Sequence, residues 1–250
     1  MFPPTGENTG DAGRRFPAWG WPMATAPRSS DNTGRSAPFD GVLDFFAAAP
    51  GVGVSVLDPG GRILFVNEEA GRLYLGLTPA QIIGKTLAEL FPAEWVAQRM
   101  DVIRRATESG QAVITRTLWR GRQIESVTRR FIGAEGEPPT LLVITREGQS
   151  RRVPEGAIVV ESETVDLGPL DALTPRELEV LALIGQGLAA KEIAGVLDCS
   201  PRTVERHRDA LGKKLNVDDR VRLAMVAREA GLELRDAKLK RVRSDASHER

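Results

Sequence analysis

Cysteine is nearly absent from this chain of 250 residues, in which Cys199 is the single one and only two histidines occur. One thiol can form neither an intrachain disulfide nor a cysteine-based metal cluster, and such sparse use is typical of a reducing compartment. We therefore expect a cytoplasmic protein without a metal site.

Long apolar runs and an excess of one charge are missing as well. No stretch approaches the ~18 apolar residues of a membrane span, and the first twenty residues lack the apolar segment of a signal peptide. The 34 basic residues balance the 34 acidic ones. We therefore expect neither a membrane partner nor secretion. Because the net charge is zero, any positive charge that attracts nucleic acid has to be concentrated in one part of the chain.

Catalytic motifs are the third absence. The chain shows no nucleophile elbow, phosphate loop, metal-ligand spacing or paired-carboxylate pattern. We expect no catalytic residue, and we do not expect an enzyme.

Composition divides the chain into segments. Residues 1–37 are rich in Gly, Pro, Ser, Thr and Asn without an apolar period, so we predict that they are disordered. The run FDGVLDFFAAA at 39–49 predicts a short amphipathic helix. Residues 149–168 have the composition of a linker, in which AIVV could add a short strand, and residues 235–250 that of a flexible charged tail.

Residues 38–148 alternate β-rich runs with helical patterns. A hairpin is predicted near 53–66, with its turn at Asp58, Pro59, Gly60 and Gly61. Two short helical segments follow, and then residues 92–109 place Trp95, Val96, Met100 and Ile103 on one helix face with the charged residues opposite. Strand patterns recur at AVITRTLWR, QIESVTRRFIG and TLLVITRE. This order predicts a five-stranded antiparallel sheet with helices on one face.

Three features of this half resemble a PAS domain: the hairpin ending in Phe65, Val66 and Asn67, the segment IIGKTLAELFP, and the three final strands. The resemblance implies a sensory or dimerisation domain. Residues 1–200 contain no histidine, and Cys199 lies beyond this half, so a histidine-ligated haem and a thiol-linked chromophore are excluded. No cofactor is predicted, and an empty dimerisation domain and a non-covalent small ligand both remain open.

The C-terminal part shows helix starts at regular intervals. Thr174, Pro175 and Glu177 form a capping-box pattern before LEVLALIGQGL, and KEIAGVL is a second short helix. Ser200 is placed to cap a third helix that runs to about Leu215, and Asp219 to cap a fourth that Gly231 closes. We predict a four-helix, all-α domain at 169–234, so that the whole chain is of the α+β class.

The third helix has two faces. Val204, His207, Leu211 and Leu215 recur at helical spacing and are predicted to pack inward. The other face carries the polar and basic side chains that a helix in the major groove of DNA requires: Glu205, Arg206, Arg208, Asp209 and Lys213.

The string LTPRELEVLALIGQGLAAKEIAGVLDCSPRTVERHRDALGKKLNV closely resembles the LuxR-type helix-turn-helix output domain, with its motif at 190–209. The resemblance implies that the third helix enters the major groove and that the fourth supports dimerisation. Ala189, Ala190 and Asp209 depart from the family pattern. Carried over residue by residue, the LuxR resemblance implies phosphate contacts at Lys191, Arg202, Thr203 and Lys213. It implies base contacts at Glu205, Arg206 and Asp209. Ser200 and Arg208 are further DNA-binding positions.

These features together predict a sequence-specific, DNA-binding transcriptional regulator. Its expected partners are double-stranded DNA and a second copy of the chain, with RNA polymerase as a further candidate. The alternative is a phosphorylation-controlled response regulator with the same output domain. That alternative needs an acidic pocket at strand ends, whereas Asp40, Asp44, Asp58 and Asp101 are scattered.

Overall fold

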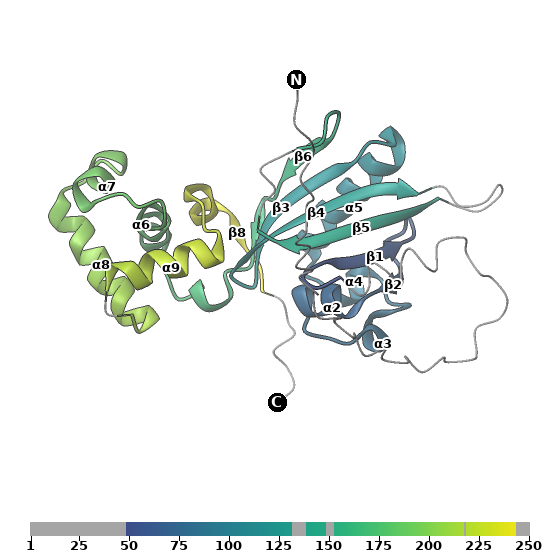
Figure 1. Cartoon of the computed structure of the whole chain (residues 1–250), viewed down its shortest axis with the longest axis horizontal. Coiled ribbons are helices and arrows are strands. Elements are labelled where there is room, and N and C mark those ends of the chain that lie inside the picture. Colours follow the sequence, from purple (N-terminus) through teal and green to yellow (C-terminus); the bar gives the residue numbers. More distant parts are fainter. Residues whose placement is uncertain (1–48, 132–138, 149–152, 218, 244–250) are drawn as a thin grey trace, which may run out of the picture. The chain divides into compact units, whose positions relative to one another are not determined.

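The computed structural model describes residues 49–131, 139–148, 153–217 and 219–243, and Figure 1 labels their elements. The predicted disordered segment of residues 1–37 lies outside the described residues, as does the predicted helix at 39–49 except for its last residue.

The first half is built on a sheet of six strands in the order β2-β1-β5-β4-β3-β6. Five of them pair antiparallel, which confirms the predicted PAS-like sheet. The sixth strand, β6, joins parallel to β3 and forms at the AIVV run, where the sequence analysis left a short strand open. The strands are β1 (Gly53–Leu57), β2 (Ile63–Val66), β3 (Val113–Trp119), β4 (Arg122–Phe131), β5 (Thr140–Glu147) and β6 (Ile158–Glu161).

The hairpin turn between β1 and β2 forms as its residues predict. The Gly61 N–H donates to the Asp58 carbonyl at 3.0 Å, and the Arg62 N–H donates to the Asp58 side chain at 2.9 Å. Gly61 has a φ of +83°, which favours glycine because it has no Cβ.

Helices cover one face of this sheet (Figure 1). Their buried residues, including Leu73, Ile82, Trp95 and Ile103, form one core with the inward side chains of the strands. The strand β4 contributes Ile124 to the same core. The helices are α2 (Glu68–Tyr74), α3 (Pro79–Ile82), α4 (Leu87–Leu90) and α5 (Ala93–Ser109).

The predicted linker is largely ordered structure. Besides β6, it contains the short strand β7 (Thr164–Val165), and Thr164 to Leu167 are all buried. The prediction of a flexible tail from residue 235 onward was also wrong for the first part of that segment. The segment Leu234–Lys238 forms the 3₁₀ helix η2, and β8 (Lys240–Arg241) pairs in parallel with β7. The composition of these segments suggested solvated chain. Their apolar side chains Val165, Leu167 and Val242 are buried, however, and this burial stabilises the ordered structure.

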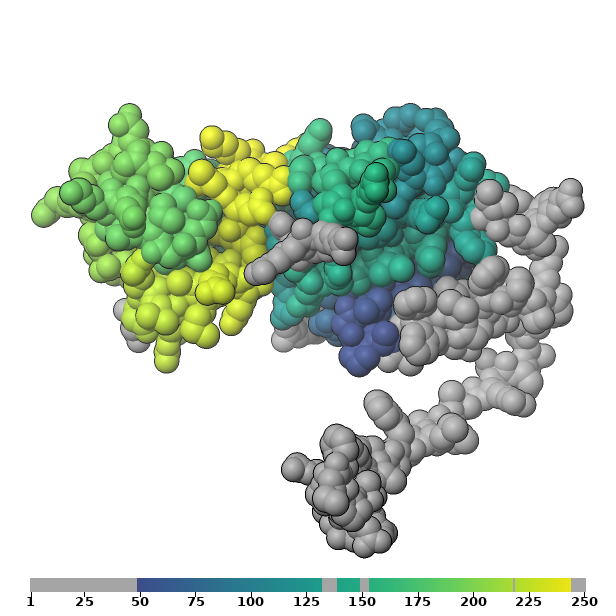
Figure 2. All heavy atoms as spheres, turned by 45° about the horizontal axis from the view of Figure 1, so that its top comes forward, coloured from purple at the N-terminus to yellow at the C-terminus, as the bar shows by residue number. Residues whose placement is uncertain are grey.

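The second half is a bundle of four helices around one core, as predicted. Leu178, Leu181, Ile193, Leu211 and Leu223 contribute buried side chains from each of the helices. The space-filling view shows these helices packed closely together, in green and yellow (Figure 2). They are α6 (Pro175–Gly185), α7 (Ala190–Val196), α8 (Pro201–Leu215) and α9 (Arg220–Ala230), with η1 (Gly168–Leu170) before them.

Candidate nucleic-acid interface

The helix α8 begins and ends where its sequence predicts. The Ser200 hydroxyl accepts the Thr203 N–H at 3.1 Å, which satisfies one of the free donors of the first turn. Pro201 occupies the first helical position, and Asn216 closes the helix in the left-handed region with a φ of +53°. These local interactions set the bounds of α8, a helix of 15 residues.

The inward face of α8 is anchored in the bundle core. Val204 is 2% exposed and Leu211 is fully buried. His207 and Leu215, which were predicted on the same face, are half-buried at its edge. Hence the opposite face of α8 is free to meet a partner.

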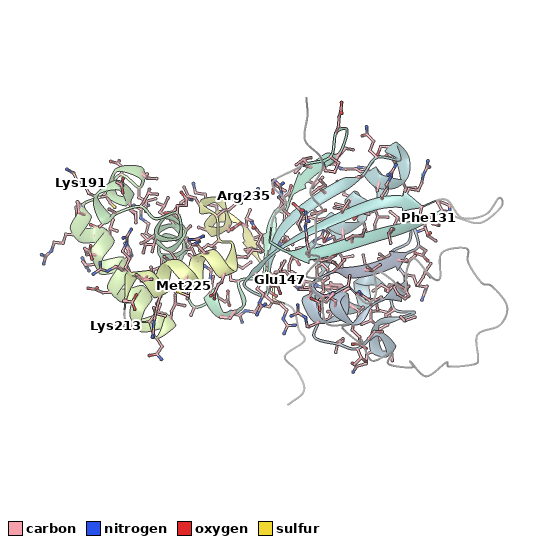
Figure 3. All side chains as sticks on the ribbon, viewed as in Figure 1. Phe131, Glu147, Lys191, Lys213, Met225 and Arg235 are labelled. Atoms are coloured by element: carbon pink, nitrogen blue, oxygen red, sulfur yellow. The ribbon has the colours of Figure 1, made fainter. Side chains whose placement is uncertain are left out.

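The outer face of α8 is defined by four exposed side chains. A helix turns by about 100° per residue, so the positions farthest from the Val204 direction are 202, 206, 209 and 213. The side chains at these positions are all exposed: Arg202, Arg206, Asp209 and Lys213. Three cations and one carboxylate therefore give this face a net charge of about +2. These side chains face solvent rather than the core of the bundle. Figure 3 labels Lys213 on α8 and Lys191 on α7.

Glu205 and Arg208 lie on the flank of α8. Their side chains form an ion pair with 2.8 Å between Arg208 Nη2 and Glu205 Oε2. Both line a shallow hollow of about 240 Å³ together with Ala189, Ala190 and Arg220. The flank faces the start of α7 and α9, so these two residues stand apart from the four on the outer face.

The hydroxyls of Ser200 and Thr203 already have partners. Their oxygens lie 2.9 Å apart, in addition to the capping bond of Ser200. The phosphate contact predicted for Thr203 and the DNA contact predicted for Ser200 would come from the same turn that carries Arg202.

The helix α7 compensates for the departure at Ala189. Alanine cannot accept a hydrogen bond through its side chain, but the Glu192 carboxylate accepts the Ala189 N–H at 2.6 Å. Lys191 is exposed on the first turn of this helix. The start of α7 thus keeps its predicted position without the polar cap.

Two arginines to which the sequence analysis assigned no role in the site hold the turns of the bundle. Arg220 donates to the carbonyls of Gly187 and Leu188 at 2.8 Å each, between α6 and α7. Arg176 donates to the Leu197 carbonyl at 2.6 Å, at the turn before α8. Each bond crosses more than 20 residues of sequence, so no local pattern could have identified them.

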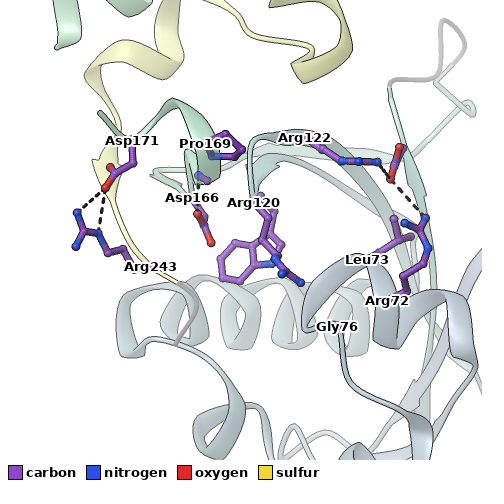
Figure 4. Close-up of a pocket in the computed structure, with 12 residues that line it drawn as sticks. Arg72, Leu73, Gly76, Arg120, Arg122, Asp166, Pro169, Asp171 and Arg243 are labelled. Atoms are coloured by element: carbon purple, nitrogen blue, oxygen red, sulfur yellow. Dashed lines mark hydrogen bonds and ion pairs between the residues drawn. The ribbon is translucent and has the colours of Figure 1, made fainter. Parts of the chain in front are cut away.

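A wide pocket of about 700 Å³ lies beside the turn between β3 and β4 (Figure 4). Arg122 and Arg72 both pair with Glu147, at 2.8 and 3.5 Å, and Arg243 pairs with Asp171. These pairs neutralise most of the pocket's charge, and we assign it no ligand. Within the described ranges, no group of three or more His, Cys, Asp or Glu side chains is placed to bind a metal ion.

A second cavity, of about 70 Å³, lies inside the first domain between the sheet and the helices α2 to α5. Its walls are mostly apolar, with Tyr74, Arg99, Ser126 and Thr128 as the main polar groups besides Trp95. The Tyr74 and Ser126 hydroxyls share a hydrogen bond of 2.6 Å.

Comparison with known proteins agrees with this architecture. Residues 171–227 match the family described as bacterial regulatory proteins, luxR family, and residues 49–153 match the PAS fold. Within this chain, a segment with the PAS fold is thus followed by a LuxR-type helix-turn-helix segment. None of its described helices has both the length and the apolar character needed to cross a membrane.

Several individual proteins are similar to parts of the chain. The nitrate/nitrite response regulator protein NarP of Escherichia coli is 39% identical over 97 residues, which cover 36% of this chain and 45% of NarP. The transcriptional regulatory protein UhpA of Escherichia coli is 49% identical over 57 residues, or 23% of this chain and 29% of UhpA. The chain thus spans less than half the length of these relatives. Among solved structures, the VqmA–ligand–DNA complex of Vibrio cholera aligns at 20% identity and a TM-score of 0.44 over 77% of this chain and 89% of VqmA.

Proposed function

We propose that this protein is a transcriptional regulator that binds specific duplex DNA through α8. The observation that carries the proposal is the outer face of α8, where Arg202, Arg206 and Lys213 are exposed while Val204 and Leu211 anchor the helix in the core. The width of the major groove admits such a helix, and arginine and lysine supply its contacts to bases and phosphates.

The contacts divide by position. Arg206, in the second turn, is assigned to base readout because its planar fork matches the two acceptors of guanine. Lys191, Arg202, Thr203 and Lys213 are assigned to phosphates. Asp209 is also assigned to the base-facing side, while Glu205 and Arg208 support this face from its flank.

A second copy of the chain is the proposed partner on DNA. On α9, Val221 is 69% exposed and Met225 is 53% exposed, one turn apart. Apolar side chains so placed gain free energy when a partner covers them. Two-fold symmetry of the protein then implies an inverted-repeat site, with RNA polymerase as a further candidate partner.

The alternative of phosphorylation control receives less support. NarP carries the name of a response regulator, but the match covers only part of both chains. The first half of this chain has the antiparallel sheet of a PAS fold, whereas a phosphoacceptor pocket requires clustered acidic side chains at strand ends. The PAS domain is therefore assigned to sensing or dimerisation.

Selection from a random duplex library, followed by anisotropy measurements with the full chain, tests the proposal. Affinity for the selected site should fall steeply with salt, because the bound cations release counterions from DNA. A triple variant, Arg202→Ala with Arg206→Ala and Lys213→Ala, should lose this binding. The number of counterions released on binding, measured from the slope of affinity against salt, should fall by about two to three.

The matched control removes three exposed arginines from the PAS domain, as Arg104→Ala with Arg105→Ala and Arg129→Ala. It changes the net charge equally and should leave both affinity and salt slope near those of the unmodified protein. Absence of duplex binding at low salt, or equal losses in both triple variants, would contradict the role of α8.

A further inference from the structure

Two residues that line the cavity of the PAS domain each carry a buried hydrogen-bond donor that has no acceptor among the described residues. Arg99 and Trp95 both line it, and they are 8% and 4% exposed. Arg99 Nη2 and Trp95 Nε1 are buried, and neither has a hydrogen-bond partner among the described residues. The two residues lie one turn apart on α5, with the Arg99 guanidinium carbon 4.7 Å from the centre of the Trp95 ring.

The described residues around Arg99 supply it with no carboxylate. None of the residues that the structure describes in the cavity lining is an aspartate or glutamate. On its other side Arg99 borders a hollow with Asp101, Glu161 and Glu163. Asp101 pairs with Arg104 and Arg105, and Glu161 pairs with Arg116 and Arg235. Among the described residues, this buried cation therefore contacts the ring of Trp95 but pairs with no carboxylate.

Such an arrangement is costly unless an acceptor enters. A buried donor without a partner destabilises a fold by about 1–3 kcal/mol, and more where the group is charged. Buried polar groups of this kind call for an explanation such as a bound ion, a water or a ligand. A water satisfies a donor but leaves the charge of Arg99 uncompensated, whereas an anion satisfies both.

We propose that this cavity binds a small carboxylate with an apolar body, whose oxygens pair with Arg99 Nη2 and Trp95 Nε1. A carboxylate accepts hydrogen bonds only and matches the guanidinium in geometry and charge. The remaining walls suit an apolar body, because Leu57, Ile82 and Val143 line them. The paired hydroxyls of Tyr74 and Ser126, 2.6 Å apart, mark the sheet side of the cavity.

The size of the cavity limits the ligand. Its volume of about 70 Å³ would hold roughly five water molecules, since one needs about 10–15 Å³ of such space. The ligand is therefore a small acid. The proposal depends on the PAS cavity alone and is independent of DNA binding by α8.

Calorimetric titration of the full chain with two acids and their neutral isosteres tests this inference. The probes are benzoate against benzamide, and 3-methylbutanoate against 3-methylbutanamide. At least one acid should bind at least tenfold more tightly than its amide, because an ion pair with a buried guanidinium exceeds a neutral hydrogen bond.

Two variants assign the donors. Arg99→Met keeps an unbranched side chain without the charge, so it should weaken binding of the acid roughly tenfold to hundredfold and leave the amide unaffected. Trp95→Phe keeps the ring without the N–H and should weaken the acid about two- to tenfold. Arg105→Met, on the exposed side of α5, is the matched control and should bind as the unmodified protein does.

Thermal unfolding without ligand separates a binding role of Arg99 from a structural one. A guanidinium kept for a ligand should cost stability when the cavity is empty, so Arg99→Met should raise the unfolding midpoint. A lower midpoint, equal affinity for acid and amide, or absence of binding by both acids would each overturn the inference. Duplex binding measured on the same preparations shows whether the DNA proposal stands when this one fails.

Discussion

Lys214 Nζ lies 2.7 Å from Glu177 Oε2 and joins the last turn of α8 to the first turn of α6. Glu177 is only 5% exposed, and its carboxylate also accepts the Thr174 N–H at 2.7 Å. Burial acts to raise the pKa of Glu177, but the bonds from Lys214 and Thr174 outweigh it and leave this pKa below its ordinary value. The proposed recognition helix is thereby fixed to the scaffold at the end far from Ser200.

Glu177→Gln should destabilise the protein by about 1–3 kcal/mol at pH 7, because Lys214 loses its charged acceptor. Since the folded pKa is lowered from 4.5, the ion pair contributes fully above about pH 4.5 and is lost as the pH falls through the folded value. Urea unfolding at pH 7 and pH 3.5 measures this difference, which should shrink at the lower pH. Glu205→Gln, in the more exposed pair with Arg208, is the control and should cost less than about 1 kcal/mol. A loss that is equal at both pH values would contradict the assignment.

Arg206→Ala should weaken binding to the selected DNA site by roughly 1–3 kcal/mol and relax the preference at one base position. Its side chain is exposed on the outer face of α8, where a base contact is geometrically available. Binding to random duplexes should change little. Anisotropy titrations against the selected site and against its single-base variants provide the measurement. If selected and random DNA weaken equally, Arg206 contacts phosphate instead.

Lys213→Ala should weaken all duplexes alike and reduce the salt slope by about one. Lys213 is exposed near the end of α8 and carries a flexible point charge without base specificity. Affinities at several salt concentrations give the slope, with Arg129→Ala on the PAS sheet as a control for the lost charge. An unchanged slope would place Lys213 away from the phosphates.

How far the sequence predicts this molecule depends on whether an interaction is local. The caps by Thr174, Ser200 and Asp219 were predictable because donor and acceptor lie three residues apart. The pairing of β7 with β8 was not, because about 75 residues separate Thr164 from Lys240 and composition alone favoured a linker and a tail.

The PAS cavity shows a different failure of pattern analysis. The charged residues of α5 were expected opposite the apolar face, yet Arg99 is buried. Its position offered a signal, because it lies four residues from both Trp95 and Ile103 and so shares their face. Hydrophobicity scales place arginine at the protein surface by default, so the sequence pattern did not reveal the charge that Arg99 adds to the cavity lining.

The dimer proposal also changes in detail. The LuxR resemblance implies that α9 supports dimerisation, but its apolar residues Leu223 and Ala227 are buried in the bundle. The exposed apolar pair is Val221 with Met225, and Figure 3 labels Met225 on α9. This pair is the surface left for a second copy.

Met225→Glu should weaken dimerisation on DNA roughly tenfold or more, because a charge would have to be buried in the interface. Sedimentation of the protein with an inverted-repeat duplex reports the stoichiometry. Val196→Glu is a matched control, since Val196 is 53% exposed as Met225 is, but lies on α7. A dimer that tolerates Met225→Glu as well as the control would exclude α9 as the interface.

Asp236→Asn should stabilise the protein at pH 8 but not near pH 4. Burial raises the pKa of Asp236 from 3.8 to about 6, despite the hydrogen bond that its carboxylate accepts from the Glu233 N–H. The folded state therefore holds this proton more tightly than the unfolded state, so stability falls as the pH rises from about 4 to about 6, by on the order of 1–3 kcal/mol. Asparagine keeps an oxygen for the Glu233 N–H and removes the buried charge. Urea unfolding of both proteins across this range measures the difference, which should grow with pH and level off above about pH 7. Asp209→Asn on the exposed face of α8 should leave the pH dependence unchanged, and a constant difference between Asp236→Asn and the unmodified protein would show that Asp236 does not titrate in this window.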